Sequence, residues 1–170
     1  MAASMYTFSV DSFTRALHQL IAILEKAQAH AQARKIDPAA LIDARLYPDM
    51  FPLAEQVRRC ADGAVNAAAY LSGQEPPPRG EPNERSISEL IARVRNALRA
   101  LEAFEPAQID DSQERAVAMK TPRGTMNFVG LSFLQAFALP NFYFHVTTAY
   151  DILRHNGVEI GKMDYLGPVG

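Results

Sequence analysis

The chain has 170 residues, of which 48% are hydrophobic and 21% are charged, a balance typical of one globular domain with a sizeable core. Its net charge of −2 and its pI near 6.1 argue against a nucleic-acid partner, which would select a basic surface. A lone cysteine, Cys60, excludes an internal disulfide, and no apolar run reaches the ~20 residues that span a bilayer. The first residues lack the pattern of a signal peptide, so we expect a cytoplasmic protein with no membrane partner.

Two helices are predicted near the start of the chain. In the first, from about residue 7 or 9 to residue 31, apolar residues recur on one face at a period of 3.6. Asp37 is a good N-cap and Pro38 suits a first turn, which predicts a short second helix. That helix should end before Tyr47, because the following proline disfavours helical geometry there.

Proline, glycine and serine punctuate the middle of the chain. A long helix is expected to open at Pro52 and to stop at Gly73. The stretch QEPPPRGEPNER, residues 74–85, has four prolines and a glycine and is predicted to be a loop. Residues 86–89, SISE, form a capping-box pattern that opens the next long helix, which should end near residues 104–106.

The helical period is interrupted at residues 106–129. There AVAMK and TMNFV flank TPRG, which predicts a short β-hairpin lying on the helices. A helical segment is expected at 131–139, and Pro140 should either kink it or start the last long helix. Gly157 suits a C-terminal cap, and apolar residues in the tail beyond it suggest that the tail packs on the bundle.

These elements predict an all-α fold. Four long helices with apolar stripes, one short helix after the first, and a small hairpin before the last should form a single four-helix-bundle domain over residues 1–170. We expect residues 1–5 to be flexible.

One line of polar residues crosses the otherwise apolar last helix. At 100° per residue, Asn141, His145 and Thr148 fall within about 60° of one another. The i, i+4 spacing of Asn141 and His145 would let both side chains reach one metal ion. Alternatively, His145 is a buried histidine that makes two hydrogen bonds, to Asn141, Thr148 or a tyrosine.

The other candidate residues leave the metal hypothesis incomplete. A zinc site needs three or four protein ligands, and only His18 is placed to join His145. Asp49 lies in a turn between prolines, where it either accepts backbone hydrogen bonds or faces a cavity. Gln56 either reaches the bundle interior or stays solvated. Cys60 is expected to pack in the core without forming a reactive thiolate.

Two segments resemble a known family. The ending LPNFYFHVTTAYDILRHNGVEIGKMDYLG, residues 139–167, and LYPDMFPLAEQVRRCAD, residues 46–62, are similar to a bacterial family of unknown function within the DinB/YfiT-like superfamily of proposed metalloenzymes. The proline-rich loop before a capped helix is similar too. The resemblance implies a four-helix bundle, commonly a homodimer.

It also implies a possible divalent-metal site. In metal-binding members of the superfamily, three histidines hold the ion, one from the second long helix and two from the last. His145 corresponds to the second of that last pair, Asn141 to the first, and Gln56 to the second-helix histidine. The triad is therefore incomplete, with one histidine of three.

Two functions remain open, and neither includes an assigned catalytic residue, because the chain has no G-x-S-x-G, no phosphate-binding glycine loop and no C-x-x-C. In the first, the bundle binds an unknown small molecule or a metal in a polar pocket around His145, with Asn141, Thr148, Gln56 and Asp49 as further binding residues. In the second, the protein is a non-catalytic dimeric module and His145 only satisfies buried polar groups.

Overall fold

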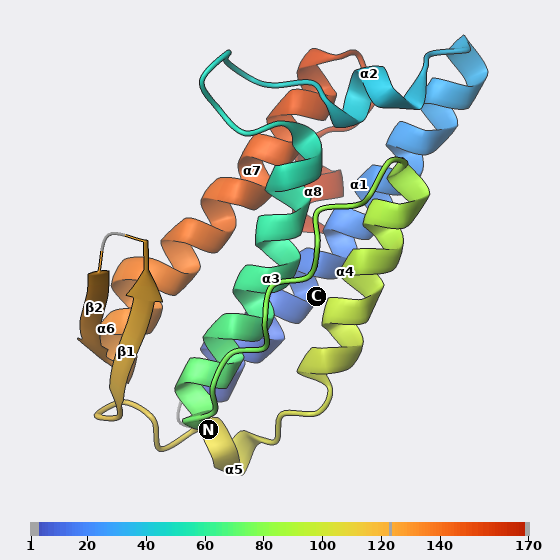
Figure 1. Ribbon diagram of the computed structural model, residues 1–170. Coiled ribbons are helices and arrows are strands. Elements are labelled where there is room, and N and C mark those ends of the chain that lie inside the picture. Colours follow the sequence, from blue (N-terminus) through green and yellow to red (C-terminus); the bar gives the residue numbers. More distant parts are fainter. Residues whose placement is uncertain (1–3, 123, 169–170) are drawn as a thin grey trace.

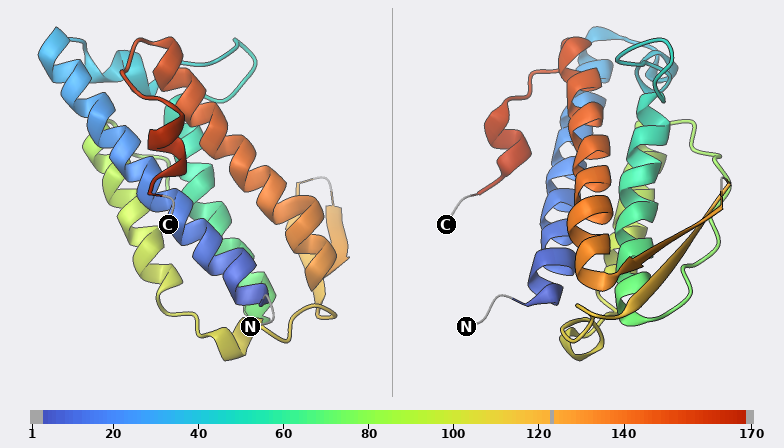
Figure 2. Two further views of the ribbon diagram at one scale, coloured as in Figure 1. Left: turned by 180° about the vertical axis from the view of Figure 1, so that it is seen from behind. Right: turned by 90° about the vertical axis from the view of Figure 1, so that its left-hand side faces the viewer.

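Long helices pack side by side around the core of the computed structural model, which describes residues 4–122 and 124–168 (Figures 1 and 2). They are α1 (Ser12–Arg34), α3 (Leu53–Ser72), α4 (Ile87–Leu101) and α7 (Leu139–His155). Helix α3 packs against both α4 and α7, and α1 packs against the same two helices from the other side. The prediction of a mostly helical chain with one small sheet is confirmed. Within the described ranges, no helix combines the length and the apolar character needed to cross a membrane.

The first helix begins with a π-helical segment, η1 (Thr7–Asp11), that continues directly into α1. Residues 1–3, part of the segment predicted to be flexible, lie outside the described residues. Met5 is buried in the core.

The predicted helix caps are present. Asp37 accepts a hydrogen bond from the backbone N–H of Ala39 at 2.9 Å and opens α2 (Pro38–Ile42). Ser86 and Glu89 form the reciprocal capping box of α4. Gly73 ends α3 with φ +77°, a left-handed conformation that glycine adopts without strain.

Helix α4 ends at Leu101, earlier than predicted. The next residues form tight turns, with the backbone N–H of Phe104 donating to the Leu101 carbonyl at 3.1 Å. Pro106 then starts α5 (Pro106–Ile109) and disfavours helical geometry in the residue before it.

The predicted hairpin consists of β1 (Ala116–Thr121) and β2 (Gly124–Val129), which pair antiparallel. It leans against the bundle beside the start of the last helix (Figure 2, right). The chain leaves the hairpin at Gly130, where an added Cβ would lie 1.9 Å from the Ser112 carbonyl oxygen. Only glycine fits at this crossing.

The last helix is continuous from α6 (Gly130–Phe133) through the π-helical segment η2 (Leu134–Ala138) into α7. Pro140 lies in the first turn of α7, and the wider π-helical turns before it accommodate a residue without an N–H. Gly157, with φ +87°, ends the helix as predicted. The tail packs through Val158 and Ile160.

The short helix α8 (Lys162–Leu166) then packs on α1, where Lys26 Nζ lies 2.5 Å from Asp164 Oδ1. Not every apolar residue of the tail packs on the bundle, since Met163 and Leu166 are exposed.

Candidate ligand-binding site

His145 is held by a buried side-chain amide. Its Nδ1 lies 2.7 Å from Gln56 Oε1, and the Gln56 amide group donates to the Phe51 carbonyl at 3.1 Å. Because the amide oxygen only accepts, Nδ1 donates and carries the proton, which leaves Nε2 as an acceptor. His145 is 5% exposed and Gln56 1% exposed. Of the two positions open to Gln56, the bundle interior is the one observed.

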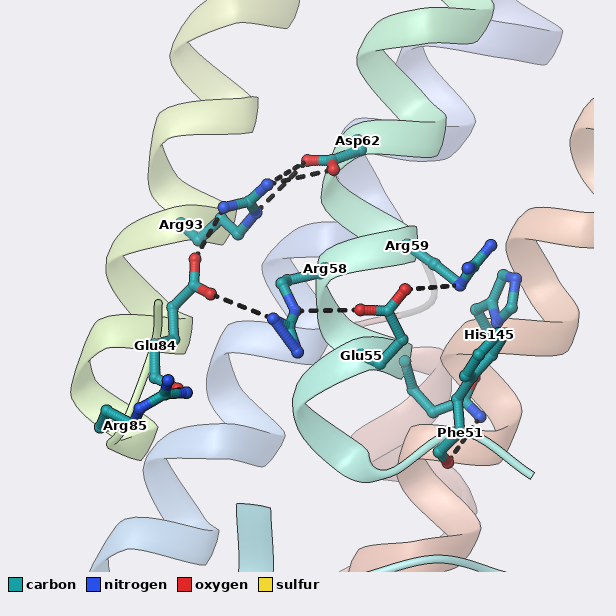
Figure 3. Close-up of polar contacts among 10 residues, drawn as sticks. Phe51, Glu55, Arg58, Arg59, Asp62, Glu84, Arg85, Arg93 and His145 are labelled. Atoms are coloured by element: carbon teal, nitrogen blue, oxygen red, sulfur yellow. Dashed lines mark hydrogen bonds and ion pairs between the residues drawn. The ribbon is translucent and has the colours of Figure 1, made fainter. Parts of the chain in front are cut away.

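The imidazole is neutral at pH 7. Burial, and to a smaller extent the nearby Arg59 guanidinium, lower the pKa of His145 to about 4. Arg59 is fixed in that position, because its Nε lies 2.9 Å from Glu55 Oε1 and its guanidinium stacks 4.1 Å from the centre of the Phe51 ring. Figure 3 shows Arg59 between Glu55 and His145. His145 is therefore a weak base beside a fixed positive charge.

Charged side chains of alternating sign continue from Glu55 across the bundle (Figure 3). Arg58 Nε lies 3.2 Å from Glu55, and its Nη1 lies 3.7 Å from Glu84. Arg93 donates to Glu84 at 2.7 Å and to both oxygens of Asp62 at 3.0 and 3.1 Å. Burial lowers the pKa of Arg93, but these hydrogen bonds raise it by more, so the guanidinium stays charged.

This network attaches the proline-rich loop to the bundle. Glu84, near the end of the loop, is only 7% exposed, while its arginine partners come from α3 and α4. Without these partners, a carboxylate buried to this extent would be costly. The loop is therefore fixed at Glu84, close to where α4 begins.

A cleft of about 530 Å³ lies on the adjacent side of α3, between that helix, strand β1, the proline-rich loop and η2. Its apolar lining comes mostly from the last helix and α3: Ala67, Tyr70, Met119, Phe133, Phe137 and Ala138. Its polar lining includes the charged network except Glu84, and six further side chains: Asn66, Arg79, Glu81, Lys120, Thr121 and Asn141. Such a volume and mixture are typical of small-molecule sites.

The predicted site residues do not share one cavity. Asn141 lines the cleft, whereas His145 and Gln56 lie beyond Glu55 and Arg59 and are not part of its wall. Thr148 is buried, and its hydroxyl donates to the Phe144 carbonyl of its own helix at 2.7 Å. Asp49 is exposed and makes no side-chain hydrogen bond within the described ranges.

Two further candidates, His18 and Cys60, do not line the cleft. His18 is exposed on α1, and no group of three or more His, Cys, Asp or Glu able to hold a metal occurs in the described part of the chain. Cys60 is completely buried, and burial raises the pKa of its thiol. As expected from the sequence, Cys60 has no features of a reactive thiolate.

Sequence reasoning missed the charged network and the cleft. Glu55 followed at i+3 and i+4 by Arg58 and Arg59 is a recognisable helical ion-pair pattern and could have been noticed. Glu84 and Arg79 lie in a loop that has no periodicity, so the sequence offered no signal for their contacts with the bundle.

A similar fold and a related sequence occur in known proteins. The model of the DUF1993 family, described as a domain of unknown function, matches residues 5–166. This chain belongs to the DUF1993 family. The crystal structure of a DinB family member from Shewanella denitrificans is similar to it, with 40% identity and a TM-score of 0.89 over 96% of this chain and 92% of that chain. No curated protein matches the chain. The predicted family, a domain of unknown function within the DinB-like superfamily, is confirmed.

The three triad positions of this DUF1993 chain, all within the described residues, do not offer a divalent ion a suitable set of donors. Of the triad implied by the DinB-like resemblance, His145 alone is a histidine. Gln56, at a second position of the triad, has both ends of its amide group bonded, to His145 and to the Phe51 carbonyl. Asn141 lines the cleft whereas His145 does not, and the Arg59 guanidinium beside the imidazole would repel a cation. These residues do not fit a divalent metal site.

Proposed function

We propose that the chain is a small-molecule-binding protein whose organic ligand occupies the cleft between α3, β1, the proline-rich loop and η2. We take the long helices as the DinB-like four-helix bundle that supports this site. In this proposal His145 is not a ligand-binding residue: together with Gln56 it holds α7 against α3 and fixes the surroundings of Arg59. A cytoplasmic location stays part of the proposal, supported by the single buried cysteine.

The observation that carries the proposal is the open space next to the Cα atom of Gly63. Gly63 lies in the interior of α3, where glycine costs about 0.5–1 kcal/mol relative to alanine. A Cβ there would meet no atom within 4 Å, so neither packing nor backbone conformation requires glycine. Gly63 does line the cleft, and any side chain at this position would reduce the volume open to a ligand.

The polar lining of the cleft supports the same proposal. Within residues 4–122 and 124–168, the side-chain amides of Asn66 and Asn141 and the hydroxyl of Tyr70 have no hydrogen-bond partner. They contrast with the arginines of the charged network, each of which is paired. Convergent unpaired polar groups above an apolar floor are what orient a ligand.

A substitution that fills the cleft tests this function. We would screen wild type, Gly63→Phe and Gly63→Ala by saturation-transfer NMR against a library of neutral, anionic and cationic aromatic fragments. Fragments that bind wild type should no longer bind Gly63→Phe but should still bind Gly63→Ala, which adds only one methyl group. Gly63→Leu serves as a second blocking variant, and thermal midpoints verify that each variant is folded. If no fragment distinguishes wild type from the folded blocking variants, the proposed function is wrong.

A metal measurement separates this function from the one implied by the resemblance. Plasma mass spectrometry of tag-free wild type and His145→Ala should give far less than one divalent ion per chain in both. A near-stoichiometric metal in wild type, lost in His145→Ala, would contradict the proposal.

A homodimeric interaction module is the second candidate, favoured by one observation. Large apolar side chains are exposed on the loop before α3 and on α7: Leu46, Tyr47, Phe51 and Phe144, at 40%, 63%, 45% and 54%. Light scattering over a range of concentrations should give a dimer mass for wild type and a monomer mass for Tyr47→Glu/Phe144→Glu if these residues form an interface. A monomer at all concentrations would exclude it.

A further inference from the structure

We infer that the ligand of the cleft is an amphipathic organic anion, with a planar aromatic body and one oxyanion group. The inference rests on the proposed function, because it names the chemistry of the molecule that would occupy the same cleft. Three features carry it: the aromatic floor, the charges of the lining, and the state of pairing of those charges.

Aromatic rings form the floor of the cleft. The Phe133 ring lies 5.5 Å from the Tyr70 ring in an edge-to-face contact and 6.0 Å from the Phe137 ring in a stacked one. Phe133 is buried beneath the other two, which are half-buried and line the cleft. An aromatic body can stack on these rings and gain contact area from a preformed cluster.

Cationic side chains outnumber anionic ones in the lining. Five cationic and three anionic side chains line the cleft, while Glu84 and Glu75, which form ion pairs with lining residues, lie outside the lining. One anionic group on a ligand suits this excess of cations in the lining.

The cation that is open to a ligand can be assigned to the rim. Arg58, Arg59 and Arg93 are paired with Glu55, Asp62 and Glu84 inside the network. Lys120 has a long contact of 3.5 Å with Glu75, and both side chains are more than four-fifths exposed.

Arg79, on the proline-rich loop, has no ion-pair or hydrogen-bond partner within the described part of the chain, while Glu81 two residues further on is exposed. Since a guanidinium recognises oxyanions with up to five donors, the geometry assigns the anion to Arg79.

Two fluorescent probes that differ by one charge test the inference on the full chain. They are 8-anilinonaphthalene-1-sulfonate and N-phenyl-1-naphthylamine, which share their ring system but differ in the sulfonate. Both are titrated into wild type, Gly63→Phe, Phe137→Leu, Arg79→Ala and Arg34→Ala. Arg34 is an exposed arginine at the end of α1, outside the lining of the cleft, so its removal changes the net charge equally.

The sulfonate should bind at one site, and Arg79→Ala should weaken its binding by about three- to fivefold, the upper part of the range for an exposed ionic contact. The neutral probe should be unaffected by Arg79→Ala, and Arg34→Ala should change neither. Added salt should weaken the sulfonate alone. Phe137→Leu should weaken both probes, and Gly63→Phe should abolish both.

The other outcomes are distinguishable. Equal effects of Arg79→Ala and Arg34→Ala, or equal affinity for the two probes, would overturn the anion while leaving cleft binding intact. Failure of the sulfonate to bind wild type would also overturn the anion. Binding of both probes that survives in folded Gly63→Phe would place the probes elsewhere, and would count against the cleft itself.

Discussion

Helix α3 carries two side-chain amides in different surroundings. One is buried and fully hydrogen-bonded, on what we call the closed side of the helix, and the other faces the cleft, on the open side. Toward α7, Gln56 is 1% exposed and both ends of its amide group are bonded, to His145 and to the Phe51 carbonyl. Toward the hairpin and the proline-rich loop, Asn66 lines a cleft of about 530 Å³ and has no partner within the described ranges. A bonded amide stabilises the packing of two helices, whereas an unbonded amide facing a cleft is available to a ligand.

The comparison teaches that the residue that is most conspicuous in a sequence need not be the one that is chemically available. His145 stands out among rings and branched side chains, but burial makes it a weak base whose Nδ1 is already committed. Gly63 belongs to none of the motifs noted in the sequence, and it lines the cleft. Four predictions test this contrast between a closed and an open side.

The largest effect is expected at Gly130, which supports the open side. Gly130 joins the hairpin, one wall of the cleft, to the last helix, and a Cβ there would lie 1.9 Å from the Ser112 carbonyl oxygen. Because that neighbour is backbone and cannot rotate away, Gly130→Ala should lower the free energy of unfolding by about 3 kcal/mol or more. Urea denaturation measures it. Gly161→Ala is the control, since a Cβ at Gly161 meets no atom within 4 Å. Similar midpoints for the two variants would contradict the structure.

The next effect concerns the attachment of the proline-rich loop. Glu84→Gln removes the charge that Arg58 and Arg93 share, and the loss should be about 3 kcal/mol, the lower end for a broken buried ion pair. The lower end applies because each arginine keeps a second carboxylate, Glu55 or Asp62. Glu81→Gln, at an exposed position of the same loop, should leave the urea midpoint unchanged. Equal changes in both variants would mean that burial of Glu84 contributes no stability.

The closed side should be sensitive to acid through His145. Its pKa is about 4 in the folded state and near 6.5 in the unfolded chain, so the unfolded state binds the proton more readily. The stability from this site is fully present above pH 6.5 and is lost as the pH falls toward 4. Between pH 8 and pH 4.5 the loss should be roughly 2–3 kcal/mol. Urea midpoints at both pH values, in wild type and His145→Gln, isolate it. A variant that keeps the whole acid sensitivity of wild type would exclude His145 as the source.

Much of the fold could be predicted because its signals are local. The N-cap at Asp37, the capping box at 86–89 and the glycines that end α3 and α7 each act within one turn of helix. The hairpin followed from a turn sequence between two short strands. Helix ends were less accurate where no such signal exists, as at Leu101.

The candidate site could be predicted only in part because its contacts are not local. Helical spacing placed Asn141 and His145 on one line, but their side chains face different surroundings, a cleft and a buried amide. Thr148 lies on the same line and bonds its own helix, as buried hydroxyls in helices often do. Arg79 and Glu84 reach the site from a loop, and only the folded chain brings them to α3.

The smallest expected effect has the opposite sign and tests the open side directly. Gly63→Ala removes the conformational freedom of a glycine from the interior of α3, where a Cβ meets no atom within 4 Å. The free energy of unfolding should therefore rise by about 0.5–1 kcal/mol. Gly130→Ala, the same substitution at the crowded crossing, should change the free energy of unfolding in the opposite direction. The two variants therefore compare open with occupied space for one and the same glycine-to-alanine change. If Gly63→Ala destabilised the protein, the space above α3 would be filled in solution, and the cleft would not be open to a ligand.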